Sequence, residues 1–273
     1  MANSLGAAIS VFPRNDVPRS SPAPKVRLFC FPSAGGGVQS FTRWAASLPR
    51  YLELCPFELP GRGTRLREAG PRRMRELISA IAAAISGSLD RPFAIFGHSL
   101  GALIGFELTR YLKTNVHKEP SQLFVSGSRA PHLLRTEMPS YTLPDEEFQR
   151  RIVRFNGTPR EILEHQELMS LMLPILRADL ELFETYTYRD EPRLSCPIRA
   201  FAALQDPMVP LDDARQWNCH TSGAFSISVL PGDHFFVANS ERQLISTLCE
   251  DIEFVTPVRT ASSPSRVRRT MGS

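Results

Sequence analysis

A glycine-flanked serine between an apolar run and an apolar helix constrains this chain more than any other feature. Gly97-His98-Ser99-Leu100-Gly101 matches the pattern G-x-S-x-G. Residues 93–96 are wholly apolar, as in a strand buried on both faces, and residues 100–113 carry apolar side chains at helical spacing. An abrupt turn from strand to helix strains the serine backbone, and glycines without a Cβ let the two elements pass closely. The context therefore predicts Ser99 as a nucleophile at the carboxyl edge of a parallel sheet.

The pentad alone is a weak signal, because glycine and serine each make up about 7% of ordinary sequences. The alternative is a chance match, which such a pentad reaches in roughly one chain in ten of this length. The strand before the pentad and the helix after it favour the nucleophile. The start of that helix would also offer free N–H groups, which can stabilise a negatively charged oxygen.

The composition places this 273-residue chain among ordinary globular proteins and excludes some functions. It has 42% hydrophobic and 22% charged residues, and it is long enough for one large α/β domain with an insertion. Its formal charge of +4 belongs to the ends: residues 1–24 carry +1 and residues 256–273 carry +4, so residues 25–255 carry −1. A near-neutral body without a basic, aromatic-rich stripe argues against nucleic-acid binding. Both end segments have the polar, proline-containing composition of disordered chain.

Targeting signals and cysteine usage indicate the compartment. No apolar run reaches the roughly 18–20 residues that a membrane span needs, and residues 1–24 lack the basic and apolar regions of a secretory signal. Five cysteines are scattered without metal-ligand spacing: Cys30, Cys55, Cys196, Cys219 and Cys249. Such a set argues against a disulfide framework or a zinc site. We therefore expect a cytoplasmic protein without a metal or a membrane contact.

Strand and helix patterns alternate along most of the chain. Strand-like apolar runs occupy residues 26–31, 52–57, 93–96, 122–126, 198–204 and 225–229. Helical patterns occupy residues 41–48, 72–88, 100–113 and 241–254. This alternation predicts a mainly parallel sheet with helices on both faces, formed by residues 25–132 and 187–255.

The alternation is interrupted between residues 133 and 186. Three helical pieces are expected there instead of strands, at residues 145–154, 159–169 and 171–186. An all-helical insertion after the fourth strand predicts a lid over the site, which should shape substrate preference and gate entry.

A serine hydroxyl becomes an effective nucleophile only when a base takes its proton and an acid orients that base. His234 follows the last predicted strand, at the sheet edge where Ser99 is expected. His220 precedes that strand and so belongs to the opposite edge, while His98 is expected to pack against neighbouring loops. The sequence therefore favours His234 as the base, with a buried structural histidine as the alternative.

The acid is expected at the end of another strand. Asp206 directly follows the strand at residues 198–204. Asp212 and Asp213 come later and are expected to cap the next helix, whereas Asp233 is adjacent to the base and should point away from it. The order serine, aspartate, histidine along the chain favours Asp206.

Two backbone N–H groups are needed to stabilise the oxyanion that forms when the serine attacks a carbonyl. Leu100, the residue after the nucleophile, is expected to supply one. The glycine-rich residues 33–37 follow the first strand, and we favour Ala34 there as the second donor. A plain glycine turn is the alternative.

At these residues the chain resembles the type II thioesterases, the discrete editing thioesterases of polyketide and nonribosomal peptide synthesis. The similarity spans about residues 25–255 and is far more specific than the pentad alone. Its marks are Phe31-Pro-Ser-Ala-Gly-Gly36, Glu58-Leu-Pro-Gly-Arg-Gly63, Phe96-Gly-His-Ser-Leu-Gly101, Ser128-Arg-Ala-Pro-His132, Gly157-Thr-Pro159, Leu173-Pro-Ile-Leu-Arg-Ala-Asp179, Asp206-Pro207, Trp217 and Pro231-Gly-Asp-His-Phe-Phe236.

The resemblance implies an α/β-hydrolase fold and hydrolysis of acyl thioesters on the phosphopantetheine arm of acyl or peptidyl carrier proteins. Aberrant or stalled chains would thereby be removed. It also implies the triad Ser99, Asp206 and His234, the backbones of Ala34 and Leu100 as oxyanion donors, and no metal or bound cofactor. Two departures, Asn156 for a frequent glycine and Leu100 for a commoner methionine, do not touch the chemistry.

Other functions stay open at this point. Medium-chain fatty-acyl thioesterases of fatty-acid synthesis resemble the same family. A general carboxylesterase or lipase would use the same triad, with the insertion as a lipid-facing lid. An inactive hydrolase-fold interaction module belongs to another class, and the three filled triad positions argue against it. Neither the pathway nor the preferred acyl chain follows from the sequence.

Overall fold

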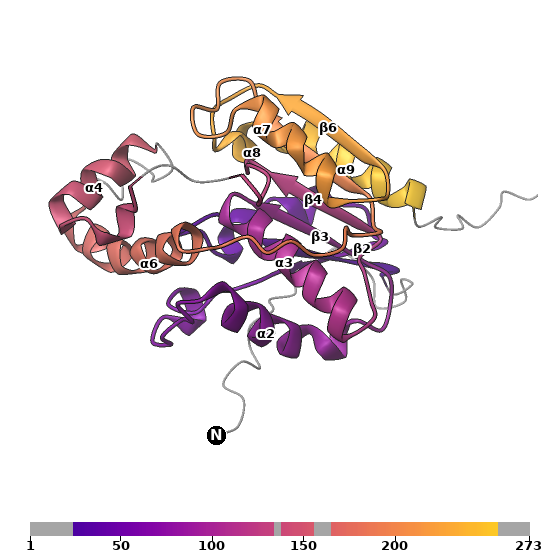
Figure 1. The fold of residues 1–273 in the computed structure, drawn as a ribbon, viewed down its shortest axis with the longest axis horizontal. Coiled ribbons are helices and arrows are strands. Elements are labelled where there is room, and N and C mark those ends of the chain that lie inside the picture. Colours follow the sequence, from indigo (N-terminus) through magenta and orange to yellow (C-terminus); the bar gives the residue numbers. More distant parts are fainter. Residues whose placement is uncertain (1–23, 134–137, 156–164, 256–273) are drawn as a thin grey trace, which may run out of the picture.

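The computed structural model describes residues 24–133, 138–155 and 165–255 (Figure 1). Within these ranges six parallel strands form one sheet, in the order β2-β1-β3-β4-β5-β6. Their bounds are β1 (Val26–Phe31), β2 (Leu52–Pro56), β3 (Phe93–His98), β4 (Gln122–Ser126), β5 (Ile198–Ala203) and β6 (Phe225–Leu230). The predicted parallel sheet is confirmed, and each of these strands begins and ends within two residues of its expected bounds.

The strand order reverses beside β1. The chain runs from β1 to β2 at one edge, then returns to β3 on the other side of β1 and continues outward to β6. The loops that leave β1 and β3 therefore diverge, and ligands of open α/β sheets bind at the carboxyl ends of strands where the order reverses. Residues 33–37 and Ser99 directly follow these two strands.

Helices cover both faces of the sheet (Figure 1). The α-helices are α1 (Trp44–Ser47), α2 (Met74–Ile85), α3 (Leu100–Asn115), α4 (Asp145–Arg154), α6 (Gln166–Glu184), α7 (Leu211–Arg215), α8 (Phe236–Asn239) and α9 (Glu241–Val255). Short 3-10 helices are η1 (Val38–Phe41), η2 (Gly63–Arg65), η3 (Ser86–Ser88), η4 (Ser140–Thr142) and η5 (Gln216–His220). α2 and α3 pack on one face of the sheet, and α1 and α9 pack on the other.

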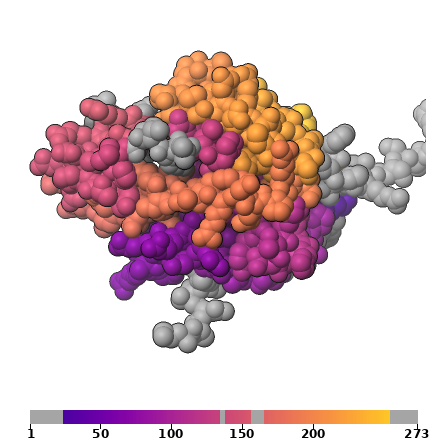
Figure 2. Space-filling view, in the orientation of Figure 1, coloured from indigo at the N-terminus to yellow at the C-terminus, as the bar shows by residue number. Residues whose placement is uncertain are grey.

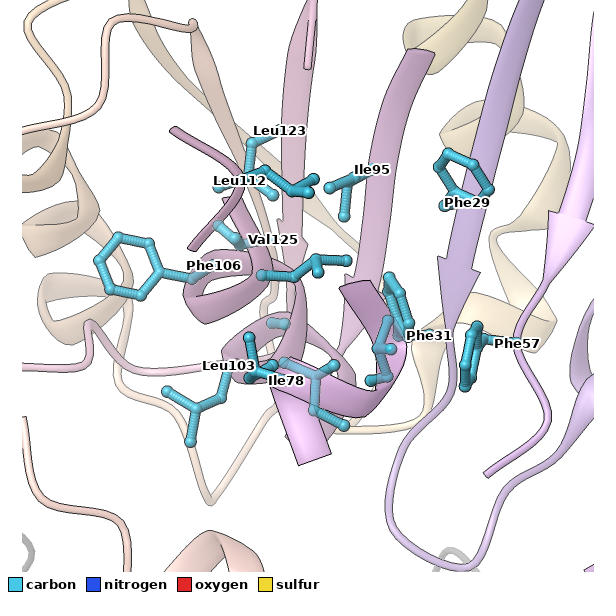
Figure 3. Close-up of a cluster of buried hydrophobic side chains, with 14 of the residues drawn as sticks. Phe29, Phe31, Phe57, Ile78, Ile95, Leu103, Phe106, Leu112, Leu123 and Val125 are labelled. Carbon is cyan, nitrogen blue, oxygen red and sulfur yellow. The ribbon is translucent and has the colours of Figure 1, made fainter. Parts of the chain in front are cut away.

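Alternating side chains of β1 build a core on each face, because successive side chains of a strand point to opposite sides. Phe29 and Phe31 join the core under α2 and α3, where Leu103 also lies (Figure 3). Leu28 and Cys30 join the core under α1 and α9. Each full burial of such a large apolar side chain stabilises the fold by about 1.5–3 kcal/mol. The two cores hold the carboxyl edge of the sheet as a rigid platform for the site.

The insertion forms a lobe beside the sheet, built mainly from α4 and α6 (Figures 1 and 2). The two helices share a small core of their own, made by Phe148 and Ile152 of α4 with Leu176 and Leu180 of α6. The described part of residues 133–186 contains helices and no strand, in agreement with the sequence pattern. Its role as a lid stays a prediction.

The predicted division of the insertion into separate helices at residues 159–169 and 171–186 is wrong. α6 runs without a break from Gln166 to Glu184. Ser170, between the two expected pieces, lies inside this helix and donates its hydroxyl to the Glu167 carbonyl of the preceding turn at 2.7 Å. Residues 156–164, where the first piece was expected to begin, lie outside the described residues.

Two further differences concern short elements. The single helix expected at residues 41–48 is instead η1 followed by the four-residue α1. α8 intervenes between β6 and the final helix, where the sequence pattern indicated only loop. The end segments expected to be disordered, residues 1–24 and 256–273, lie outside the described residues apart from Pro24.

Candidate active site

Ser99 lies in the turn between β3 and α3, in a backbone conformation that residues with side chains rarely adopt. Its φ is 53° and its ψ is −115°. Only glycine fits on either side: a Cβ on Gly97 would lie 2.0 Å from the Gly101 carbonyl oxygen, and a Cβ on Gly101 would lie 2.1 Å from the Phe31 carbonyl oxygen. The Ser99 N–H donates to the Ser126 carbonyl of β4 at 2.8 Å. The turn therefore presents the serine hydroxyl at the carboxyl edge of the sheet.

Three strand ends bring Ser99, His234 and Asp206 together. His234 Nε2 lies 3.1 Å from Ser99 Oγ, and His234 Nδ1 lies 2.8 Å from Asp206 Oδ2. The Asp206 side chain is fully buried and that of His234 is 5% exposed. The carboxylate favours the tautomer with the proton on Nδ1, so Nε2 is left to accept the serine proton. This arrangement can activate the hydroxyl for attack on a carbonyl carbon.

Backbone donors orient the Asp206 carboxylate toward the histidine. Its Oδ1 accepts hydrogen bonds from the N–H groups of Met208, at 2.8 Å, and Val209, at 3.1 Å. Its Oδ2 is thereby directed at His234. Hydrogen bonds of this kind fix the position of a buried carboxylate.

The other acids considered from the sequence make different contacts. Asp233 accepts from the Phe235 N–H at 2.9 Å. Asp213 accepts from Arg129 Nε at 2.7 Å. The expectation that Asp212 and Asp213 cap the next helix is wrong: both lie in the first turn of α7, after an N-cap at Pro210. Negative charge in a first turn is favourable without forming a cap.

His220 takes part in a different cluster. Its Nε2 lies 2.7 Å from His132 Nδ1, beside a separate cavity of about 410 Å³ that is lined by neither Ser99 nor His234. Burial, followed by the nearby charge of His132, lowers the pKa of His220 to about 4. The sequence prediction that His220 is not the base agrees with this placement.

His98 is a buried neighbour of His234. Its Nδ1 lies 3.0 Å from Ser126 Oγ, and its ring centroid lies 5.3 Å from that of His234. Burial, with a smaller effect of His234, lowers the pKa of His98 to about 3. His98 is therefore uncharged at neutral pH and packs against His234 without competing for the serine proton.

The expected oxyanion donors lie on adjacent segments. Leu100 begins α3, and the first four N–H groups of a helix have no partner within the helix. The contact between Gly101 and the Phe31 carbonyl brings the helix start against the end of β1, directly before residues 33–37. Ala34, Ser99 and Leu100 line the same cavity. We call residues 33–37 the oxyanion loop; the role of its N–H groups stays a prediction.

The cavity at Ser99 has a volume of about 590 Å³, and the insertion supplies one of its walls. The apolar residues that the insertion contributes to the lining are Met138, Pro139, Ile152, Phe155, Leu176, Leu180 and Phe183. Sequence reasoning placed the insertion over the site but missed these individual residues. Three of them recur at i, i+4 and i+7 on α6, a spacing that marks a buried stripe but does not show that the stripe faces a cavity.

No group of three or more histidine, cysteine, aspartate or glutamate side chains among the described residues is arranged to hold a metal ion. None of the helices described has both the length and the apolar content of a membrane span.

Comparison with known proteins assigns the family. The thioesterase domain family matches residues 26–253. The chain belongs to the thioesterase family. This thioesterase is 38% identical to the gramicidin S biosynthesis protein GrsT of Aneurinibacillus migulanus, over 85% of this chain and 91% of that protein. It is 33% identical to the medium-chain S-acyl fatty acid synthase thioesterase of Rattus norvegicus, over 80% of this chain and 83% of that protein.

A solved structure agrees with the assignment. The type II thioesterase BorB from the borrelidin biosynthetic cluster superposes with a TM-score of 0.81 at 30% identity, covering 92% of this chain and 99% of that chain. The thioesterase therefore has the fold expected from the sequence, and it is a hydrolase that acts on thioester bonds.

Proposed function

We propose that this thioesterase releases acyl groups from the phosphopantetheine arms of acyl or peptidyl carrier proteins, and so removes aberrant or stalled chains from a polyketide or nonribosomal peptide synthase. The observation that carries the proposal is a pair of hydrogen bonds that connects Ser99 to His234 and His234 to Asp206, at the wall of a largely apolar cavity. Such a cavity can hold an acyl chain while its thioester carbonyl meets the serine. Similarity to the gramicidin S protein and to BorB supports the biosynthetic setting.

The first half of the proposed reaction transfers the acyl group to the enzyme. His234 Nε2 takes the proton of Ser99 as Oγ bonds to the thioester carbonyl carbon, and the carbonyl electron pair moves to oxygen. The N–H groups of Ala34 and Leu100 donate to this oxyanion. When the tetrahedral intermediate collapses, the C–S bond breaks and His234 returns its proton to the departing thiolate.

The second half releases the acid. A water molecule gives a proton to His234 and attacks the acyl-serine, and the same N–H groups stabilise a second oxyanion. Collapse restores the Ser99 hydroxyl and leaves a free carboxylic acid. The phosphopantetheine arm belongs to the substrate, and no step calls for a cofactor of the enzyme.

The test is a panel of carrier proteins loaded with different acyl groups and followed by intact mass. Wild-type enzyme should remove the acyl mass from at least one class of carrier, whereas Ser99→Ala should remove none and still bind the carrier. Matched thioesters and oxygen esters of pantetheine analogues separate a thioesterase from a general carboxylesterase. Full activity of Ser99→Ala, or inertness of the wild type toward every loaded carrier, would contradict the proposal.

A fatty-acyl carrier is the second candidate substrate. The similarity to the rat medium-chain fatty acid synthase thioesterase favours it. Carriers loaded with unbranched medium-length acyl chains belong in the same panel. A clear preference for them over polyketide-like or peptidyl chains would favour this candidate.

We further propose that this thioesterase is located in the cytoplasm. All five cysteines are free thiols in the structure, which fits a reducing compartment. Burial raises the pKa of the Cys55 and Cys196 thiols to about 12, so these thiols are poor nucleophiles.

A further inference from the structure

The oxyanion loop has little internal bonding. Among the described residues, its one internal backbone hydrogen bond runs from the Gly36 N–H to the Ser33 carbonyl at 3.0 Å. Gly35 has a φ of +72°, in the left-handed region that glycine adopts most easily. A loop of this kind keeps the N–H of Ala34 in a fixed place only if neighbouring elements hold it.

The buried carboxylate of Asp179, on α6, contacts this loop directly. Its Oδ2 accepts from the Gly35 N–H at 2.8 Å. Arg62 donates to both of its oxygens, at 2.9 and 2.7 Å, and also donates to the Gly36 carbonyl at 2.7 Å. Asp179 is 3% exposed and Arg62 is 7% exposed. One ion pair therefore binds the N–H of one loop glycine and the carbonyl of the next.

α6 also packs on the same glycine through an apolar side chain. A Cβ placed on Gly35 would lie 2.5 Å from Leu176 Cδ2. Leu176 and Leu180 line the cavity from this helix. The wall of the acyl cavity and the support of the oxyanion loop thus belong to one helix.

Stability alone does not account for a buried ion pair at this position. Removing two charges from water is costly, and apolar residues of similar size often replace such pairs without loss of stability. The pair does supply short, directional, charge-assisted hydrogen bonds. Direction matters at a catalytic donor, because a displacement of about 1 Å can slow a reaction on the order of 100-fold.

We propose that Arg62 and Asp179 are positioning residues that tie the oxyanion loop to α6 and hold the Ala34 N–H where negative charge develops. The inference rests on the proposed function, because this donor matters only if Ser99 attacks a carbonyl. Neither side chain is among those that line the cavity, so both act through the loop.

Variants of the full chain separate positioning from stability. Asp179→Asn removes the charge at constant size, and Arg62→Met removes the partner. The double variant Arg62→Met/Asp179→Leu replaces the pair by apolar groups. Asp251→Asn is the matched control, because it breaks the Arg199–Asp251 pair between β5 and α9, in which both side chains are 18% exposed.

Three quantities are measured for each variant: the thermal unfolding midpoint, kcat and KM on an acyl-pantetheine thioester, and the inhibition constant of the matching acyl trifluoromethyl ketone. Ser99 Oγ adds to the ketone carbon, its proton passes to His234, and the ketone oxygen becomes an oxyanion in the same place as in the reaction. The inhibition constant of the ketone therefore measures how well the N–H groups stabilise the oxyanion, whereas KM reflects binding of the acyl chain.

Loss of the pair should lower kcat about 10- to 100-fold and raise the inhibition constant of the ketone by the same factor. KM should change by no more than about 3-fold. The double variant should regain the unfolding midpoint that single variants lose, yet keep the low kcat. Asp251→Asn should lower the midpoint and leave kcat unchanged.

Recovery of both kcat and the midpoint in the double variant would overturn the inference, because the pair would then be purely structural. Ketone binding as tight as that of the wild type in all three variants would overturn it as well. Failure of the proposed function is distinguishable, since the wild type itself would then leave the thioester intact. The affinity of the ketone, which forms an adduct with Ser99, would still show whether the oxyanion loop is correctly placed.

Discussion

Ser99 and the glycines that flank it occupy positions where few other residues would fit. Ser99 holds a positive φ, and the glycines around it fill space that no Cβ can enter. Such strain persists only where the surrounding structure over-determines it. Here the start of α3 lies directly against the end of β1, so Ser99 and residues 33–37 are held by the same contact.

We expect Asp206 to be essential for the orientation of His234 but to contribute little to the stability of the fold. Asp206→Asn keeps the side-chain shape but can present an N–H to Nδ1, which favours the wrong histidine tautomer. We expect kcat on an acyl-pantetheine thioester to fall about 10³–10⁴-fold, with thermal stability changed far less. Steady-state kinetics with the unfolding midpoint check this; a kcat within a few-fold of wild type would remove Asp206 from the triad.

Gly101→Ala tests the close approach of α3 to β1. The added Cβ would lie 2.1 Å from the Phe31 carbonyl oxygen, a backbone atom that cannot move aside alone. We expect a loss of about 1–3 kcal/mol or more in unfolding free energy together with loss of activity. Gly87→Ala is the control, because a Cβ there meets nothing within 4 Å, and it should be neutral or stabilising by up to about 1 kcal/mol. Equal stability of the two variants in urea denaturation would contradict this reading.

Among the elements, α6 combines two tasks. One stripe of its surface packs on α4 and lines the cavity, while Asp179 in the same buried stripe contacts the oxyanion loop. The Leu176, Asp179, Leu180, Phe183 spacing places a carboxylate among apolar positions of one helix face. A charge at such a position signals a buried partner, although helical periodicity alone does not name Arg62.

Leu180→Ala should enlarge the cavity on the α6 side and shift selectivity toward longer or bulkier acyl chains. Leu112→Ala, in the core between α3 and the sheet, is the control for lost stability, because it does not line the cavity. Each substitution should cost about 2–5 kcal/mol of unfolding free energy at most. Ratios of kcat/KM across a series of acyl-pantetheine thioesters should change for Leu180→Ala only. Unchanged ratios would count against a specificity role for the insertion.

In the molecule as a whole, buried neutral histidines link folding to pH. The pKa of His98 is lowered to about 3 and that of His220 to about 4, against about 6.5 for a histidine in the unfolded chain. Above about pH 6.5 both states are neutral at these residues and contribute no pH dependence. Below that pH the unfolded chain binds protons that the folded chain does not, so the unfolding free energy decreases as pH falls.

Each of these histidines should contribute a slope of up to about 1.4 kcal/mol per pH unit between about pH 6.5 and its folded pKa. His98→Asn, which can keep a polar contact with Ser126, should lose one such contribution. His117→Asn is the control, because His117 is exposed and its φ of 56° suits asparagine. Urea denaturation across this pH range measures the slopes. The proposed linkage fails if wild type and His98→Asn have the same slope.

Much of the fold follows from short-range patterns in the sequence. Apolar runs located the six strands of the described residues, and helical spacing located α2, α3 and α9 to within a few residues, because these patterns reflect local backbone geometry and burial. The division of α6 was misjudged, since helix continuity there depends on packing against α4 as well as on local propensity.

The candidate site also has a part that the sequence predicts and a part that only the tertiary structure shows. The pentad, the strand-end positions of Asp206 and His234, and their order along the chain were sufficient to nominate a triad from sequence alone, because parallel strands bring their carboxyl ends to one edge. Only the tertiary structure decided that Ser99 and His234, 135 positions apart, come within hydrogen-bonding distance. It also decided that Arg62 and Asp179, 117 positions apart, pair beneath the oxyanion loop. Contacts of such separation depend on how whole elements pack, which no local pattern encodes.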